Sequence, residues 1–211
     1  MKSEQREKWL KKFVEGYMFR DIQVCLEGYA NFAAALALSV YTDVLGGLIN
    51  GNLTAKGESE ANYSTFLGRM GYEPKKCEQY YRDIRCGLAH QYFIKGESTV
   101  ERVALEKTKG IHERDGITYF FADTYFEEFK EAYFIYKSEL RSDTSLQAMF
   151  DKALSDEIIP YQARKYFDPS TTPLSYEVGA ISPVSGSVVI FMPKMGPMPA
   201  TESSQGEQTL A

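Results

Sequence analysis

The stretch Tyr81-Arg-Asp-Ile-Arg-Cys-Gly-Leu-Ala-His90-Gln-Tyr-Phe93 decides how the chain is interpreted. It continues a helical pattern, so we predict one helix over Lys75–Phe93. On a regular helix of about 100° per residue, one stripe of side chains consists of Cys77, Tyr81, Ile84 and Leu88, and we expect this stripe to face the core. A second stripe on the opposite side contains Asp83, Cys86 and His90. The sequence therefore predicts that His90 points toward solvent, another helix or a second copy of the chain.

Arg85 and His90 are five positions apart, which separates them by about 140° and about 7.5 Å of rise on an ideal helix. The two side chains would not converge on one phosphate without help. A local distortion at Gly87 would bring them together. Alternatively, the stretches of two subunits would meet across a twofold axis.

Helical spacing of apolar residues extends outward from this stretch in both directions. It predicts helices over 3–18, from Ile22 to a terminator at Gly46-Gly47, over 63–70, over 124–140 with Asp123 as the N-cap, and over 145–154. The segment Tyr29–Ile49 is the most apolar, but its uninterrupted part is much shorter than the roughly 20 residues that span a bilayer. We therefore expect a buried core helix and no membrane association.

Two segments after Gly96 are rich in β-branched and aromatic residues, Thr99–Lys107 and Ile117–Ala122. Between them, Asp115-Gly116 suits a tight turn in which both central residues need positive φ. These features predict a β-hairpin near 99–122. His112 precedes the turn among charged residues, so we expect it in a solvated loop.

The composition changes at Pro169, because six of the 8 prolines lie at or beyond it. We therefore predict two parts, a helical domain over 1–168 and a Pro/Ser-rich C-terminal extension over 169–211. The extension should be largely irregular, with one strand at Ser187–Met192, an apolar island within it.

Charge and cysteine usage limit the class of protein. The net charge of −5 argues against a protein that coats nucleic acid non-specifically, because such binding depends on Lys and Arg neutralising phosphates. Cys25, Cys77 and Cys86 match no disulfide or paired zinc pattern, which favours reduced thiols and a cytoplasmic location. The charged N-terminus has no apolar core of a signal peptide.

The run Arg85-Cys-Gly-Leu-Ala-His90 resembles the R-x4-6-H signature of the HEPN superfamily. The resemblance covers Met1 to about Leu154 and implies a mainly α fold, a small helical bundle that is often dimeric, here with an inserted β-hairpin. Members of that superfamily include ribonucleases of toxin–antitoxin and other defence systems. The position after the arginine, often Asn in the ribonucleases, is Cys86 in this chain.

The resemblance implies a metal-independent endoribonuclease without a cofactor, in which the RNA 2′-hydroxyl attacks phosphorus and leaves a 2′,3′-cyclic phosphate. His90 suits general acid–base catalysis, and Arg85 suits stabilisation of the charged transition state, each supplied by two subunits of a homodimer. Arg82 and Lys95 would hold flanking phosphates, and Tyr92 or Phe93 would stack on a base. RNA and an antitoxin or another protein are the implied partners.

Three alternatives stay open at this point. The chain would instead be a non-catalytic helical dimer that binds RNA or a protein. In the second alternative the motif is purely structural, with Arg85 paired to an acidic residue on a neighbouring helix and His90 capping the helix C-terminus. Cys86 and His90, four residues apart, would also suit a zinc ion, but four convergent ligands are not apparent, so we predict no metal site.

Overall fold

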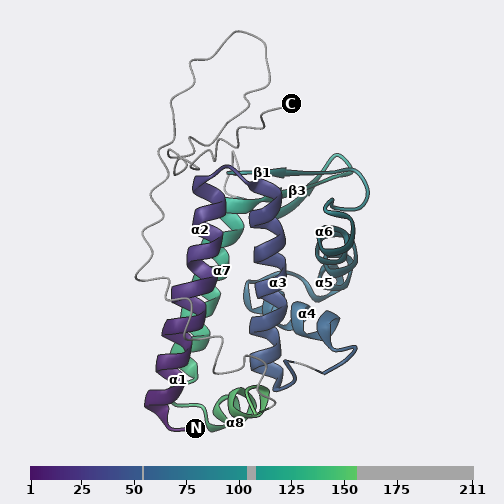
Figure 1. Cartoon of the computed structure of the whole chain (residues 1–211). Coiled ribbons are helices and arrows are strands. Elements are labelled where there is room, and N and C mark those ends of the chain that lie inside the picture. The colour runs from purple at the N-terminus through teal and green to yellow at the C-terminus, as the bar shows by residue number, and fades with distance from the viewer. Residues whose placement is uncertain (54, 104–107, 156–211) are drawn as a thin grey trace, which may run out of the picture. The chain divides into compact units, whose positions relative to one another are not determined.

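The computed structural model describes residues 1–53, 55–103 and 108–155 (Figure 1). Two compact units are distinguished along the chain, Met1–Pro169 and Ser170–Ala211, and every described element belongs to the first. The predicted extension over 169–211 and its strand at 187–192 lie outside the described residues.

The first unit is mainly helical, as the sequence predicts, with one small sheet. Three segments form one continuous N-terminal helix, α1 (Ser3–Leu10), the π-helical η1 (Lys11–Met18) and α2 (Phe19–Glu27). The remaining helical elements are α3 (Asn31–Asn50), α4 (Ser59–Arg69), α5 (Pro74–Tyr80), the π-helical η2 (Tyr81–Arg85), α6 (Cys86–Gln91), α7 (Ala122–Glu139) and α8 (Thr144–Ala153).

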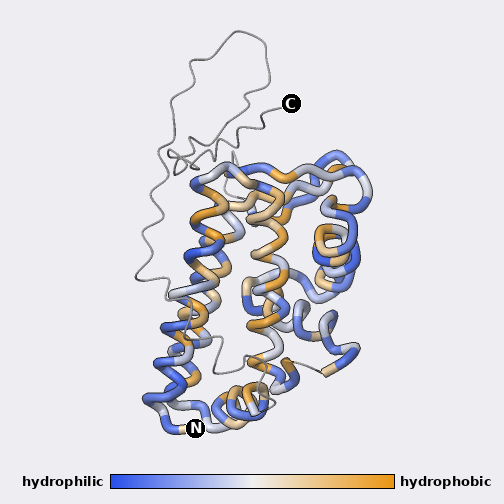
Figure 2. Tube along the Cα trace, in the orientation of Figure 1, coloured by the Kyte–Doolittle hydropathy of each residue, from blue (hydrophilic) through white to orange (hydrophobic). Residues whose placement is uncertain are grey.

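The apolar helix α3 packs against α2, α4, α7 and α8, and Figure 2 shows hydrophobic residues along most of its length. By length and composition alone it could cross a membrane, with a mean hydropathy of 1.7, and 56% of its apolar window is buried inside the molecule. Its fully buried residues include Ala34, Leu38 and Leu45. In this structure α3 is therefore a core helix.

The prediction of one long helix starting at Ile22 is wrong, because the chain turns between α2 and α3. Tyr29 is left-handed, with a φ of 56°. Its N–H donates to the Leu26 carbonyl at 3.1 Å, and the Ala30 N–H donates to the Cys25 carbonyl at 2.8 Å. This pair of bonds is the Schellman arrangement, which ends a helix with a left-handed residue that is usually glycine.

The prediction that Gly46-Gly47 ends this helix is also wrong, because α3 continues to Asn50 and ends at the left-handed Gly51. A Cβ on Gly46 would lie 1.8 Å from the backbone oxygen of Asn62 on α4. Gly46 therefore permits close contact between two helices.

The sheet has the strand order β1 (Ser98–Glu101), β3 (Ile117–Phe121), β2 (Ile111–Arg114). The turn at Asp115-Gly116 is confirmed, with φ values of 54° and 79°. The strand paired through that turn was assigned wrongly: β2 forms the antiparallel hairpin with β3, whereas β1 lies parallel to β3 on its other edge. His112 consequently lies in β2 opposite Tyr119, and the prediction of a loop position is wrong.

Asp123 does not cap α7, contrary to the sequence-based expectation, because that helix already begins at Ala122. Its carboxylate instead accepts two hydrogen bonds from Arg102, one of them 2.9 Å long from Nη2. Arg102 also donates from Nη1 to the Leu26 carbonyl at 2.5 Å. One guanidinium thus joins the end of α2 to the beginning of α7.

Candidate functional site

The helix that carries the motif is not regular, contrary to the prediction. α5, η2 and α6 are continuous, and the wide π turn of η2 ends at Arg85. Such turns occur frequently at functional sites. The buried side of this helix contains Cys77, Tyr80, Ile84 and Leu88, so Tyr80 takes the deep position that was predicted for the half-buried Tyr81.

Arg85 is directed into the protein. Its Nη2 donates to Oδ2 of Asp43 on α3 at 2.8 Å, and the two side chains are 20% and 14% exposed. The same Asp43 oxygen accepts a hydrogen bond from Ser59, and the guanidinium lies 5.7 Å from the centre of the Tyr81 ring. Burial is the main cause that raises the pKa of Tyr81, while its hydrogen bond with Ser59 opposes the rise. This is the acidic partner on a neighbouring helix that the alternative interpretation expected.

His90 is exposed near the end of α6, as the sequence predicts. In the part of the chain that the structure describes, its side chain makes no hydrogen bond or ion pair, and Arg85 is paired with Asp43 instead. Gly87 does not distort the helix to unite them, since α6 is regular from Cys86 to Gln91. One chain therefore does not assemble Arg85 and His90 into a catalytic pair.

Gly87 serves instead to hold the segment that follows α6, residues 92–95. A Cβ at Gly87 would lie 2.5 Å from the carbonyl oxygen of Phe93. The Lys95 N–H donates to the Asp83 carbonyl at 2.9 Å, and Ile94 is buried. The segment thus folds back onto the helix and is fixed at several points.

Tyr92 ends α6 in a left-handed conformation, with a φ of 64°, and its N–H donates to the Leu88 carbonyl at 3.1 Å. Glycine is the usual residue at such a position because a Cβ is disfavoured there. Strain of this kind in a bulky residue is often associated with functional sites. Tyr92 is therefore a candidate for a role other than packing.

Three aromatic rings meet at the end of α6, and we call Phe32, Tyr92 and Phe93 the aromatic shelf. The ring centre of Phe32 lies 5.7 Å from that of Tyr92 and 5.8 Å from that of Phe93. Tyr92 and Phe93 are 51% and 61% exposed. Sequence reasoning proposed both of these rings but missed Phe32, because only the fold brings the start of α3 to the end of α6.

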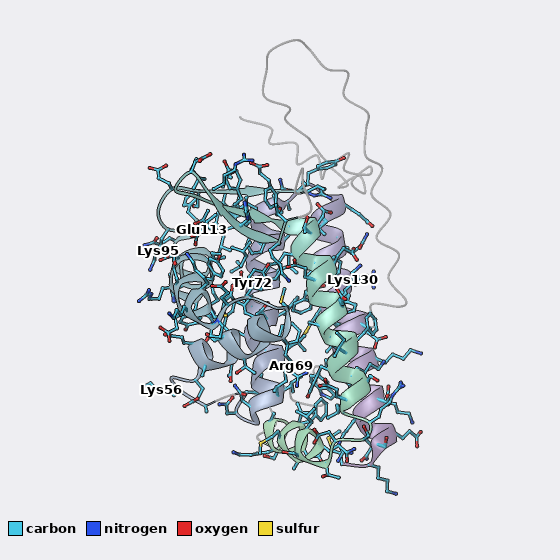
Figure 3. All side chains as sticks on the ribbon, turned by 180° about the vertical axis from the view of Figure 1, so that it is seen from behind. Lys56, Arg69, Tyr72, Lys95, Glu113 and Lys130 are labelled. Atoms are coloured by element: carbon cyan, nitrogen blue, oxygen red, sulfur yellow. The ribbon has the colours of Figure 1, made fainter. Side chains whose placement is uncertain are left out.

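Arg82 and Lys95, the predicted phosphate contacts, are both exposed, and Lys95 lies at the outer edge of the molecule on the α5–α6 side (Figure 3). Cys86 is half-buried. The described residues contain no group of three His, Cys, Asp or Glu side chains that could hold a metal ion, so the zinc alternative for Cys86 and His90 gains no support.

Comparison with known proteins gives no relative for this chain: no family model matches it, and no match was found among the curated proteins or the solved structures.

Proposed function

We propose that the protein is a helical RNA-binding domain of the HEPN kind, which holds RNA at the exposed end of α6. The observation that carries this proposal is the grouping of His90, Tyr92, Phe93 and Lys95, all exposed, within six consecutive residues of one anchored segment. A cation, an imidazole and two rings suit the phosphates and bases of RNA. Arg82, exposed on the same helix, adds a second cation.

The direction of Arg85 favours binding over cleavage by a single chain. Its ion pair with Asp43 occupies the guanidinium that the ribonuclease mechanism would aim at a phosphate. The acidic net charge of −5 further limits binding to a local site rather than a broad surface.

Metal-independent endoribonuclease activity is the second candidate, and it is favoured by the exposed His90, whose side chain has no hydrogen-bond or ion-pair partner among the described residues. Two copies in a homodimer would bring two His90 imidazoles to one phosphate, one as general base for the 2′-hydroxyl and one as general acid for the leaving oxygen. Arg85 would then need to exchange Asp43 for the phosphate. The antitoxin partner and the cytoplasmic location stay predictions from the resemblance and from the three free thiols.

Binding is tested by fluorescence anisotropy with a labelled mixed-sequence RNA at several salt concentrations. The Arg82→Ala and Lys95→Ala variants should each weaken binding and reduce the slope of log K against log salt by about 0.7, as expected for one lost phosphate contact. Lys56→Ala is the matched control, because Lys56 is an exposed lysine in the loop between α3 and α4 (Figure 3). Unchanged binding in both variants would exclude the α6 end as the RNA site.

Cleavage is tested by incubating the RNA pool with protein in excess EDTA. Cyclic-phosphate ends that wild type produces and His90→Ala does not would establish the enzyme. Bound but intact RNA would leave the binding module as the function.

A further inference from the structure

We propose that the aromatic shelf of Phe32, Tyr92 and Phe93 stacks on unpaired bases, so that the site takes single-stranded RNA and rejects duplex. This inference rests on the proposed RNA-binding function and names its substrate class. It also adds a residue on α3, Phe32, which lies outside the motif.

The exposure of the shelf needs an explanation, because hydrophobic rings gain free energy by leaving water. More than half of the Phe93 surface and about half of the Tyr92 surface remain in water. Phe32 meets Phe93 edge to face, with an interplanar angle of 78°, and meets Tyr92 at 31°. Phe32 is partly buried and packs against the core, whereas Tyr92 and Phe93 keep ring surface that a ligand can reach.

The shelf is fixed before any ligand arrives. The Tyr92 N–H is bonded to Leu88, the Lys95 N–H to Asp83, and the Phe93 carbonyl packs against Gly87. Tyr92 also keeps a left-handed backbone that its side chain disfavours. A rigid, strained segment that displays two rings loses little conformational entropy on binding, which favours a binding role for the rings.

The exposed lysine beside the shelf favours an anionic ligand that also has flat groups. Lys95 follows Phe93 by two residues and His90 precedes Tyr92 by two, and both are exposed. A lysine and an imidazole next to exposed aromatic rings match a strand in which phosphates and bases alternate. Bases in a duplex are already stacked on one another, so only unpaired bases can use the rings.

The test compares a labelled single strand with the same sequence in a duplex by anisotropy. Wild type should bind the single strand more tightly. Phe93→Ala and Phe32→Ala should each weaken single-strand binding by about 5- to 150-fold, the loss that follows from one base–aromatic stack. The salt slope should stay unchanged in both variants, because no phosphate contact is removed.

Phe134→Ala is the matched control, since Phe134 on α7 is 50% exposed and contacts Phe19 and Tyr133 rather than the shelf. Phe93→Leu separates stacking from simple hydrophobic contact and should fall near Phe93→Ala. Equal affinity for both RNAs, or wild-type affinity in both shelf variants, would refute base stacking on the shelf but not the proposed RNA-binding function. If the wild-type protein binds no RNA, both the proposed function and base stacking on the shelf are refuted.

Discussion

A double-mutant cycle at Asp43 and Arg85 would show whether the motif arginine supports the fold. The pair is 2.8 Å long, and its side chains keep only 20% and 14% of their exposure. Removing one partner of a fully buried ion pair costs about 3–5 kcal/mol, whereas exposed pairs contribute about 0.2–1 kcal/mol. Asp43→Ala should therefore lower the free energy of unfolding by about 2–3 kcal/mol, because it leaves a mostly buried guanidinium without its carboxylate.

Arg85→Ala should cost less, about 1–2 kcal/mol, because the Asp43 carboxylate keeps its hydrogen bond from Ser59. The double variant should then be more stable than the sum of the two losses implies, with a coupling energy of about 1–2 kcal/mol. Urea unfolding followed by circular dichroism measures all four proteins. Losses that add within about 0.5 kcal/mol would refute a direct Asp43–Arg85 interaction.

Three further perturbations test other parts of the account. Tyr92→Gly should change stability by less than about 1 kcal/mol in urea unfolding, because relief of left-handed strain of about 1–2 kcal/mol offsets the lost ring contacts; a loss above about 2 kcal/mol would make Tyr92 a packing residue. Gly46→Ala should lower the free energy of unfolding by about 3 kcal/mol, since the new Cβ would lie 1.8 Å from the Asn62 backbone. Gly68→Ala, whose Cβ would have nothing within 4 Å, should raise it by up to about 1 kcal/mol. Equal effects of the two variants would contradict the close contact of α3 and α4. The pKa of Asp151 is lowered in the folded state, mainly by the hydrogen bond from Arg6, so this carboxylate stabilises the protein above its unfolded pKa of about 3.8, and the stabilisation is lost as pH falls below that value. In thermal unfolding from pH 2 to 6, the melting temperature of Asp151→Asn should therefore fall less steeply toward acid pH than that of wild type. An identical fall in the two proteins would contradict this pKa shift.

Much of the helical layout could be predicted from sequence, because apolar spacing reports which side of a helix is buried. The helices near 63–70, 75–93, 124–140 and 145–154 all exist, with ends displaced by a few residues. The Asp115-Gly116 turn was predicted for the right reason, since both residues need positive φ. These features depend on local backbone preferences, which the sequence reports directly.

The errors came from tertiary contacts that override local preference. Gly46-Gly47 looks like a helix terminator in isolation, but α4 requires the space that its missing side chains leave. Tyr29 breaks the long helix although its residue type disfavours the left-handed conformation. β1 pairs with β3 in parallel, which no turn signal between adjacent strands can reveal.

Only part of the candidate site could be predicted from sequence, because tertiary contacts between distant segments complete it. The exposure of His90 followed from helical periodicity, and Tyr92 and Lys95 follow it closely in the chain. The Asp43 partner of Arg85 and the Phe32 partner of the two rings come from α3, far away in sequence. The π-helical segment η2 also departs from the regular helix geometry on which the two stripes of the motif helix were predicted.

Ultraviolet crosslinking tests the central claim most directly, namely that RNA binds at the end of α6. The protein is irradiated with bound single-stranded RNA, digested with nuclease and trypsin, and analysed by mass spectrometry. Trypsin cuts after Arg85 and Lys95, so one peptide, Cys86–Lys95, carries His90 and both exposed rings of the shelf. The account predicts the main nucleotide adduct on this peptide, at Tyr92 or Phe93. Adducts concentrated on other peptides at saturating RNA would contradict it.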